Sequence, residues 1–218
     1  MAAAKQFSLI YTSSSTAKMA DPSSLSNAHL FKVSSFEWDV RVDFSRKIIS
    51  GSVTFNIVGG ENGGDVVLDT SYLDIAGVKV NGASTPFAVG ERQGALGSPL
   101  TVRAGDASKG AFTLSIEYAT TRDCTAVHWL DPPQTEGKVH PYLFTQAQAI
   151  HARSLFPCFD TPSVKAPFTA SVRVPAGLVA VMGARSSECQ QVDGEQLCRF
   201  AQPVGVPVRT FVYFWSAV

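Results

Sequence analysis

The side chains best suited to chemistry gather in one stretch of the sequence, residues 128–165. It holds three of the four histidines, His128, His140 and His151, together with Arg153 and several prolines. Prolines interrupt regular strands and helices, so this stretch should depart from the strand pattern around it. Loops that hold such residues against a rigid sheet often carry function, and we therefore expect the functional site here.

One local combination offers the parts of a hydrolase. His151, Ser154 and Asp160 supply a base, a nucleophile and an orienting carboxylate within a short distance in the sequence. Triads are normally assembled from distant segments, however, and Pro157 and Pro162 favour an extended or turning path over a shared helix face. A structural or pocket-lining role is the better interpretation, and we assign no catalytic residue to this chain.

Motifs for metal, nucleotide and hydrolase chemistry are missing from the sequence. It has no H-E-x-x-H, and no two of its histidines are four residues apart, as two zinc ligands on one helix face would be. No C-x-x-C pair, G-x-S-x-G elbow, phosphate-binding loop or dinucleotide fingerprint occurs either. We therefore predict no metal ligands and no cofactor in this chain.

The overall composition is that of a packed domain without a strong electric field. Of the 218 residues 45% are hydrophobic, enough for a sizeable core, and 18 basic residues balance 18 acidic ones. A neutral chain has no field to attract nucleic acid or an anionic membrane, and no apolar run approaches the roughly 20 residues that span a bilayer. We therefore exclude nucleic acid and membrane as partners and expect a soluble protein.

The start of the chain differs from the rest. Residues 1–20 contain no acidic side chain, a Ser/Thr cluster, and Lys5 and Lys18, a composition weakly like an organelle transit peptide that lacks arginine. A disordered tail, or an upstream start before Met19, is favoured over import. The four scattered cysteines are too few for a disulfide framework, so a reducing compartment, the cytoplasm, is the expected location.

Alternating residues predict an all-β fold. Between positions 36 and 44, aromatic and β-branched residues alternate with charged ones, as in a strand with one buried and one solvated face. The alternation resumes from Ile49 to Ile57 after the polar turn 45–47, so the two segments should form a long hairpin. Further strands are expected at 66–68, 73–80, 100–103, 112–118, 168–174, 178–184, 197–201 and 208–215.

A second predicted hairpin carries two cysteines. Asp193-Gly194 is a strong two-residue turn signal, and pairing outward from it places Cys189 opposite Cys198. Counting from a hydrogen-bonded first pair, the cysteines fall on a non-hydrogen-bonded site with Cα atoms about 4.5 Å apart, within reach of a disulfide. We expect adjacent thiols that could oxidise, with two unremarkable strand cysteines as the alternative.

A long motif carries a resemblance to a known family. The stretch from His140 to Lys165, H-P-Y-L-F-T-Q-A-Q-A-I-H-A-R-S-L-F-P-C-F-D-T-P-S-V-K, resembles the zinc aminopeptidases, and its first half resembles those of the leukotriene A(4) hydrolase type. Shorter segments in family order support this, among them V-L-D-T at 67–70 and W-L at 129–130. The resemblance covers about residues 21–200.

The resemblance implies a fold and a role for residues 21–218. They would form a saddle-shaped β domain of multi-stranded, largely antiparallel sheets, packed against a catalytic zinc domain that is absent from this chain. Complete enzymes of this family remove amino-terminal residues from peptides, and some also hydrolyse a fatty-acid epoxide. Gln146 and Gln148 match a Gln-x-Gln segment whose second glutamine helps to hold the peptide's α-amino group, and Ala149 follows as in the family. A neutral amide can accept a hydrogen bond from an ammonium group.

Two departures limit what the resemblance implies. Phe159 stands where leukotriene A(4) hydrolases tend to have glutamine, which weakens any inference of epoxide hydrolysis, and residues 206–218 leave the family pattern before its zinc motifs. We expect the chain to be non-catalytic alone, with the catalytic domain, or a surrogate protein, and a peptide amino terminus as partners. The alternative is a stand-alone β-sandwich that binds a peptide or protein through residues 146–153.

Overall fold

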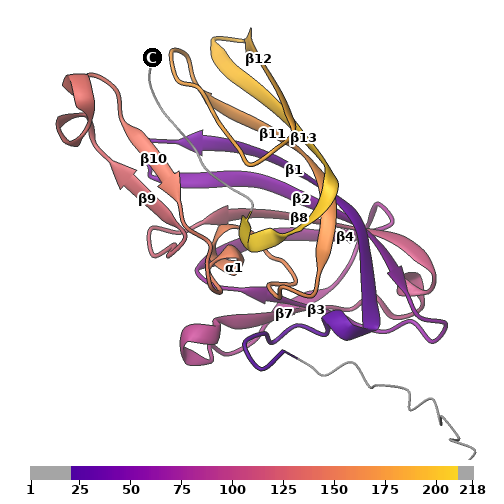
Figure 1. The fold of residues 1–218 in the computed structure, drawn as a ribbon. Coiled ribbons are helices and arrows are strands. Elements are labelled where there is room, and N and C mark those ends of the chain that lie inside the picture. Colours follow the sequence, from indigo (N-terminus) through magenta and orange to yellow (C-terminus); the bar gives the residue numbers. More distant parts are fainter. Residues whose placement is uncertain (1–20, 211–218) are drawn as a thin grey trace, which may run out of the picture.

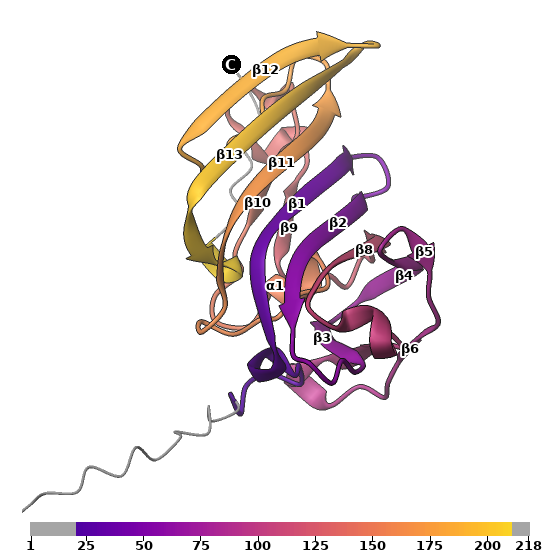
Figure 2. The ribbon, with the colours of Figure 1, turned by 90° about the vertical axis from the view of Figure 1, so that its right-hand side faces the viewer.

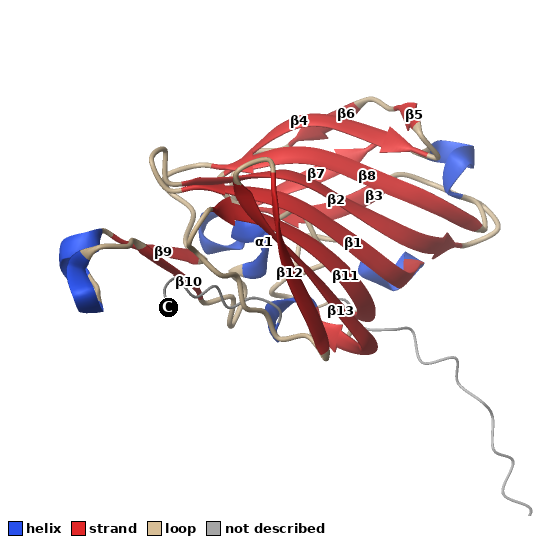
Figure 3. Ribbon diagram, turned by 90° about the horizontal axis from the view of Figure 1, so that it is seen from above, coloured by secondary structure: helices blue, strands red, loops and turns tan. Residues whose placement is uncertain are grey.

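A computed structural model gives the structure of the protein and describes residues 21–210. The tail expected at 1–20 and most of the strand expected at 208–215 lie outside the described residues. Strands dominate the described part, as Figure 3 shows, so the all-β prediction is confirmed.

One sheet of eight strands organises the fold. Its strands lie side by side in the order β12-β13-β11-β1-β2-β8-β4-β5 (Figure 2). Neighbouring strands are antiparallel except β1 and β11, which are parallel and join the two halves of the chain in one sheet. The strands are β1 (Phe31–Asp43), β2 (Ile48–Gly59), β4 (Leu73–Val80), β5 (Ala83–Ser84), β8 (Ala111–Thr120), β11 (Lys165–Pro175), β12 (Ser186–Val192) and β13 (Glu195–Pro207).

Two smaller sheets complete the architecture. One has the strand order β3-β7-β6, and the other consists of β9 and β10 and projects to one side as an arm (Figures 1 and 3). Their strands are β3 (Val66–Thr70), β6 (Phe87–Val89), β7 (Ser98–Val102), β9 (Val127–Leu130) and β10 (Tyr142–Thr145). One α-helix, α1 (Ala152–Leu155), occurs within residues 21–210, with short 3-10 helices at Ala28–Leu30, Gly94–Leu96, Gly105–Ser108, Pro132–Gln134, Glu136–Lys138 and Val208–Thr210.

The core is built from the predicted apolar faces of β1 and β2. Phe36, Trp38 and Phe55 are each 1% exposed, whereas Glu37 is exposed on the opposite face. Burying a side chain of this size stabilises the fold by roughly 1.5–3 kcal/mol. The indole N–H of Trp38 donates a hydrogen bond to the hydroxyl of Tyr118 at 2.6 Å, so the polar atoms of both rings are satisfied inside the core.

The long hairpin between β1 and β2 is confirmed. Val42 pairs with Ile49 next to the turn, and Val40 pairs with Gly51 further along. A Cβ atom built on Gly51 would lie 2.0 Å from the carbonyl oxygen of Asp39, and its φ of 155° lies outside the range that most residues adopt. The two strands can therefore approach here only because position 51 is glycine.

One of the expected strands is wrong, and another differs over its first three residues. Residues 178–184 form no strand, although Leu178, Ala180 and Met182 are buried in the predicted alternation. Alternation reports which side chains are buried, and here burial occurs without a strand ladder. Residues 208–210, the described part of the strand expected at 208–215, form a 3-10 helix whose Thr210 hydroxyl donates to the carbonyl of Pro207 at 2.8 Å.

Four observed strands were not predicted, namely β5, β6, β9 and β10. β10 and all of β9 except Val127 lie within residues 128–165, which the prolines had marked as departing from the strand pattern. β12 has no buried residue and offers no apolar alternation, so only the turn signal at Asp193-Gly194 predicted it.

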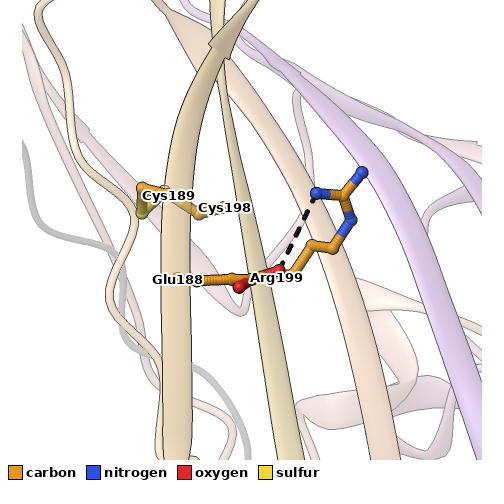
Figure 4. Close-up of a disulfide and its surroundings, with 4 residues drawn as sticks. All are labelled: Glu188, Cys189, Cys198 and Arg199. Atoms are coloured by element: carbon orange, nitrogen blue, oxygen red, sulfur yellow. Dashed lines mark ion pairs between the residues drawn. A yellow bond between two sulfur atoms is a disulfide. The ribbon is translucent and has the colours of Figure 1, made fainter.

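The cysteine hairpin has the predicted register. β12 and β13 pair Cys189 with Cys198, and the turn residues Asp193 and Gly194 have φ values of 53° and 80°, as a type I′ turn requires. The two Cα atoms are 4.1 Å apart and the sulfur atoms are joined in a disulfide (Figure 4).

Candidate functional site

The Gln-x-Gln segment continues from the end of β10. Gln146 and Gln148 are exposed, whereas Thr145 and Ala147 are buried. Because side chains alternate along an extended backbone, burial of one set turns the other set outward. The two glutamines therefore lie on one accessible face.

The two glutamines have different surroundings. The backbone N–H of Gln146 donates to the carbonyl of Ala126 at 2.8 Å, and the N–H of Gln148 donates to the side-chain Oε1 of Gln146 at 3.0 Å. Within residues 21–210, the side-chain amide of Gln148 has no hydrogen-bond partner. Gln146 thus supports the local backbone, while the amide of Gln148 keeps its oxygen acceptor and its N–H donors for a ligand.

Ala149 is the third expected site residue. It is exposed and follows Gln148 across a cis peptide bond. Its carbonyl oxygen accepts a hydrogen bond from the guanidinium of Arg209 at 3.5 Å, and the N–H of His151 donates to the carbonyl of Ala147 at 3.0 Å. The segment is therefore tied both to the turn that leads into α1 and to the 3-10 helix that follows β13.

Arg153 of α1 anchors the segment in the interior. Its side chain is 1% exposed and its Nε lies 2.9 Å from Oδ2 of Asp160. The guanidinium also donates to the carbonyl oxygens of Leu96 and Ser23, each at 2.8 Å. These acceptors compensate a charge that would otherwise be costly to bury.

Asp69 joins this cluster from β3. It is fully buried, with Oδ1 3.6 Å from Nη1 of Arg153. Its carboxylate accepts hydrogen bonds from the hydroxyl of Ser24 at 2.6 Å, the N–H of Leu25 at 2.7 Å and the N–H of Asp160 at 3.1 Å. Burial raises the pKa of Asp160, and the neighbouring Arg153 opposes that rise. The cluster joins four segments of the chain, which are residues 23–25, Asp69, Leu96 and residues 153–160.

Aromatic packing holds the chain after α1. The ring of Phe156 lies 5.7 Å from that of Trp38, and the ring of Phe159 lies 6.5 Å from that of Phe55. Both phenylalanines are almost completely buried. Phe159, at the position where the sequence departs from the leukotriene A(4) hydrolase pattern, is therefore a core residue.

His151, Ser154 and Asp160 do not form a triad. Nδ1 of His151 lies 2.7 Å from the hydroxyl oxygen of Thr125, and the hydroxyl of Ser154 accepts a hydrogen bond from the N–H of Thr125 at 2.8 Å. Ser154 is fully buried, and Asp160 pairs with Arg153 instead. The three side chains fix the loop and do not converge on a common point where a substrate could react.

The described part of the chain shows neither a metal-binding cluster nor a spanning helix. No group of three or more His, Cys, Asp or Glu side chains in residues 21–210 is arranged to hold a metal ion. No helix in the same range has the length and apolar character needed to cross a bilayer.

Comparison with protein families decides the classification. The profile of the Peptidase M1 N-terminal domain family matches residues 32–208, most of the chain. The chain belongs to this family. The match includes the Gln-x-Gln segment of the M1 domain and the buried pair of Arg153 and Asp160.

Fungal leucine aminopeptidases are among the curated relatives of this M1 domain. Leucine aminopeptidase 2-1 of Meyerozyma guilliermondii is 47% identical over 188 residues, which are 86% of this chain and 29% of that protein. Leucine aminopeptidase 2 of Saccharomyces cerevisiae is 43% identical over 191 residues, 86% of this chain and 28% of that protein. The chain thus spans less than one third of the length of these relatives.

Solved structures agree with this classification. Yeast LTA4 hydrolase in complex with Bestatin superposes with a TM-score of 0.82 at 40% identity, over 94% of this chain and 31% of that chain. An M1 zinc metallopeptidase from Deinococcus radiodurans, at 21% identity and a TM-score of 0.68 over 85% of this chain and 42% of its own, shares the fold. The predicted resemblance to aminopeptidases of the leukotriene A(4) hydrolase type is confirmed.

Sequence reasoning missed the partners that position the site. It used Asp69 only as part of a family segment and did not pair it with Arg153, 84 positions away. The available signal was an acidic residue directly after the apolar run 66–68, because a buried acid needs a cation and hydrogen-bond donors nearby. The contact of Arg209 with Ala149 had no sequence signal.

Proposed function

We propose that this chain is the amino-terminal domain of a zinc aminopeptidase and that it supplies the rim of the site where the peptide's amino terminus binds. Gln148 carries the proposal. Its amide is exposed and free of hydrogen bonds within the described residues, on a segment fastened by a buried ion cluster. The family membership, and relatives that are named leucine aminopeptidases, support the substrate class.

The recognition step is a hydrogen bond to a cation. The side-chain oxygen of Gln148 accepts a hydrogen from the α-ammonium group of the peptide, and Gln146 holds Gln148 by accepting its backbone N–H. Because Ala149 has only a methyl side chain, the backbone next to Gln148 stays accessible to a ligand. A neutral amide orients the ammonium without neutralising it, which leaves the charge for an acidic group of the catalytic domain.

Zinc belongs, in this proposal, to the part of the enzyme beyond this chain. Residues 21–210 offer no cluster suited to a metal ion, so the residues present do not fit zinc. In this proposal the described residues supply binding groups, and the catalytic groups belong to the rest of the enzyme. Its partners are the catalytic domain, or a protein in its place, and the amino terminus of a peptide, and its proposed location is the cytoplasm.

The test is kinetic and uses a complete enzyme. Residues 1–210 of this chain replace the matching domain of the Saccharomyces cerevisiae leucine aminopeptidase 2, and kcat/KM is measured on leucine p-nitroanilide. Gln148→Ala should lower kcat/KM by roughly 10-fold to 100-fold, because a hydrogen bond to a charged group contributes about 1.5–3 kcal/mol. Gln146→Ala should have a smaller effect, since Gln146 acts through the backbone of Gln148.

The matched control is Gln191→Ala, which removes another exposed glutamine amide from the edge strand β12. It should leave kcat/KM unchanged. If Gln148→Ala behaves like this control while the parent chimera is active, Gln148 does not hold the substrate.

The alternative function is a stand-alone β module that binds a peptide or protein through residues 146–153. The exposure of Gln146, Gln148 and Ala149, together with the missing metal cluster in the described residues, favours it over an independent hydrolase. Calorimetric titration of the isolated chain with a free peptide and its N-acetylated form separates the two functions. Tight binding that acetylation abolishes supports the module, and no binding supports the rim of a larger enzyme.

A further inference from the structure

The disulfide between Cys189 and Cys198 lies at the edge of the large sheet. Cys189 belongs to β12, which pairs with β13 on one side and has no strand on its other side within the described residues (Figures 2 and 4). Cys189 is exposed, whereas Cys198 is 0% exposed. The two sulfur atoms of one bond thus face different surroundings.

The sheet register explains this difference. Val40 of β1, Val172 of β11, Cys198 and Cys189 follow one another in a single row across four strands. The first three are buried on the core side of the sheet. The row ends at the sheet edge, so Cys189 is the member that solvent and small reagents can reach.

Few other side-chain contacts hold β12 in place. All seven of its residues are exposed, so apolar packing contributes little. Glu188 and Arg199, the neighbouring cross-strand pair, are 3.9 Å apart and both exposed, which makes their ion pair weak (Figure 4). The ladder hydrogen bonds and the disulfide are therefore the main links between β12 and the rest of the sheet.

The other two cysteines are poorly placed for the same chemistry. Cys158 is fully buried, and Cys124 donates its thiol hydrogen to the carbonyl of Ser154 at 2.9 Å. Burial raises the pKa of both thiols, which lowers the fraction present as reactive thiolate. Neither is paired in the described structure, so oxidation should be confined to the hairpin.

We propose that Cys189 and Cys198 form a reversible redox site, at which a low-molecular-weight thiol or disulfide such as glutathione exchanges with Cys189. The buried Cys198 is the second partner: its sulfur forms the protein disulfide during oxidation and leaves as a thiolate during reduction. Reduction removes the covalent link between the edge strand β12 and β13, and oxidation restores it.

The exchange balances in two steps. On oxidation, the Cys189 thiolate attacks one sulfur of oxidised glutathione, forms a mixed disulfide and releases one glutathione thiolate. The Cys198 thiol then loses its proton to water and attacks the sulfur of Cys189, which forms the protein disulfide and expels the second glutathione thiolate. The protein loses two electrons and two protons, and oxidised glutathione becomes two thiols.

The first test is intact mass spectrometry of the full chain in glutathione buffers of increasing oxidised fraction. The wild-type protein should lose the mass of two hydrogen atoms, and the change should reverse on reduction. Cys124→Ser is the matched control and should show the same loss. If the wild type keeps four free thiols in fully oxidised buffer, or if the bond maps to Cys124, the proposal is wrong.

Single variants test which sulfur exchanges. With Cys198→Ser, Cys189 should accumulate a glutathione adduct roughly tenfold faster or more than Cys198 does in Cys189→Ser, because only Cys189 is accessible. Far-UV circular dichroism checks that both variants are folded. Equal adduct rates in two folded variants would contradict the assignment of Cys189 as the exchanging residue.

Hydrogen exchange of the wild-type chain tests the consequence and needs no variant. Amides of β12 should exchange about tenfold faster or more in the reduced protein, while those of β1 and β2 keep their protection. If the amides of β12 exchange at the same rate in both forms, the disulfide does not stabilise β12 beyond its backbone hydrogen bonds to β13, and the proposal is wrong.

Discussion

The guanidinium of Arg153 and the carboxylate of Asp160 meet at 2.9 Å in the protein interior, and each side chain is only 1% exposed. Arg153 lies five positions after Gln148, so this pair fixes the chain immediately beyond the exposed glutamines. The same guanidinium binds the carbonyls of Ser23 and Leu96, which places the amino-terminal segment and the loop before β7 around the same point. The exposed glutamine segment is thus followed by a buried, multiply bonded ion pair.

Removal of the buried cation should destabilise the fold strongly. Arg153→Met leaves the carboxylates of Asp69 and Asp160 buried without their cation, and the free energy of unfolding should fall by about 3–5 kcal/mol. Urea unfolding followed by tryptophan fluorescence measures this change. Arg173→Met is the control, because Arg173 pairs with Asp39 at the surface and the loss should stay below about 1 kcal/mol. Equal losses in the two variants would show that the buried cluster does not anchor the site.

The buried phenol of Tyr118 predicts a loss of stability in alkali. Burial raises the pKa of Tyr118 above its ordinary value, although the hydrogen bond from Trp38 opposes the rise. Above about pH 10 the unfolded chain releases this proton while the folded chain keeps it, so the free energy of unfolding falls as pH rises, by up to about 1.4 kcal/mol per pH unit.

Tyr118→Phe tests that prediction by removing the buried phenol. Urea unfolding between about pH 9 and pH 11 should show a shallower fall for this variant than for the wild type. Tyr72→Phe, which removes a phenol from the surface, is the control and should keep the wild-type slope. A wild-type slope in Tyr118→Phe would contradict the assigned burial of that hydroxyl.

The close approach of β1 and β2 should make position 51 intolerant of a side chain. Gly51→Ala places a methyl group 2.0 Å from the carbonyl oxygen of Asp39, and relief of that contact requires the backbone to move. The free energy of unfolding should fall by roughly 2–4 kcal/mol. Gly60→Ala, where a methyl group would meet nothing within 4 Å, is the control and should have little effect. A tolerated Gly51→Ala would contradict the register of this hairpin.

Local sequence signals predicted the structure correctly at two-residue turns and in strands with one buried face. Asp193-Gly194 predicted both the turn and the pairing of Cys189 with Cys198, because a two-residue turn leaves one register. Alternation from Phe36 to Val42 predicted the buried face of β1, because side chains alternate along a strand.

Local signals failed where distant contacts determine structure. Residues 178–184 alternate in burial without forming a strand, and β9 and β10 pair with each other in a stretch whose prolines argued against strands. At the site, the resemblance identified Gln146, Gln148 and Ala149, whereas the supporting pair of Arg153 and Asp69 depends on a contact that spacing does not reveal. Sequence patterns predict local conformation and burial, but they do not identify the distant segment that a residue contacts.

The most direct test of the central claim, that this chain is the amino-terminal domain of a larger aminopeptidase, is the intact mass of the native protein. It is captured from its source with an antibody against residues 21–200 and compared with the 23.2 kDa of this chain. We predict a mass several-fold higher, together with leucine aminopeptidase activity that a zinc chelator abolishes. A mass near 23.2 kDa without that activity would contradict the claim and leave the stand-alone binding module as the function.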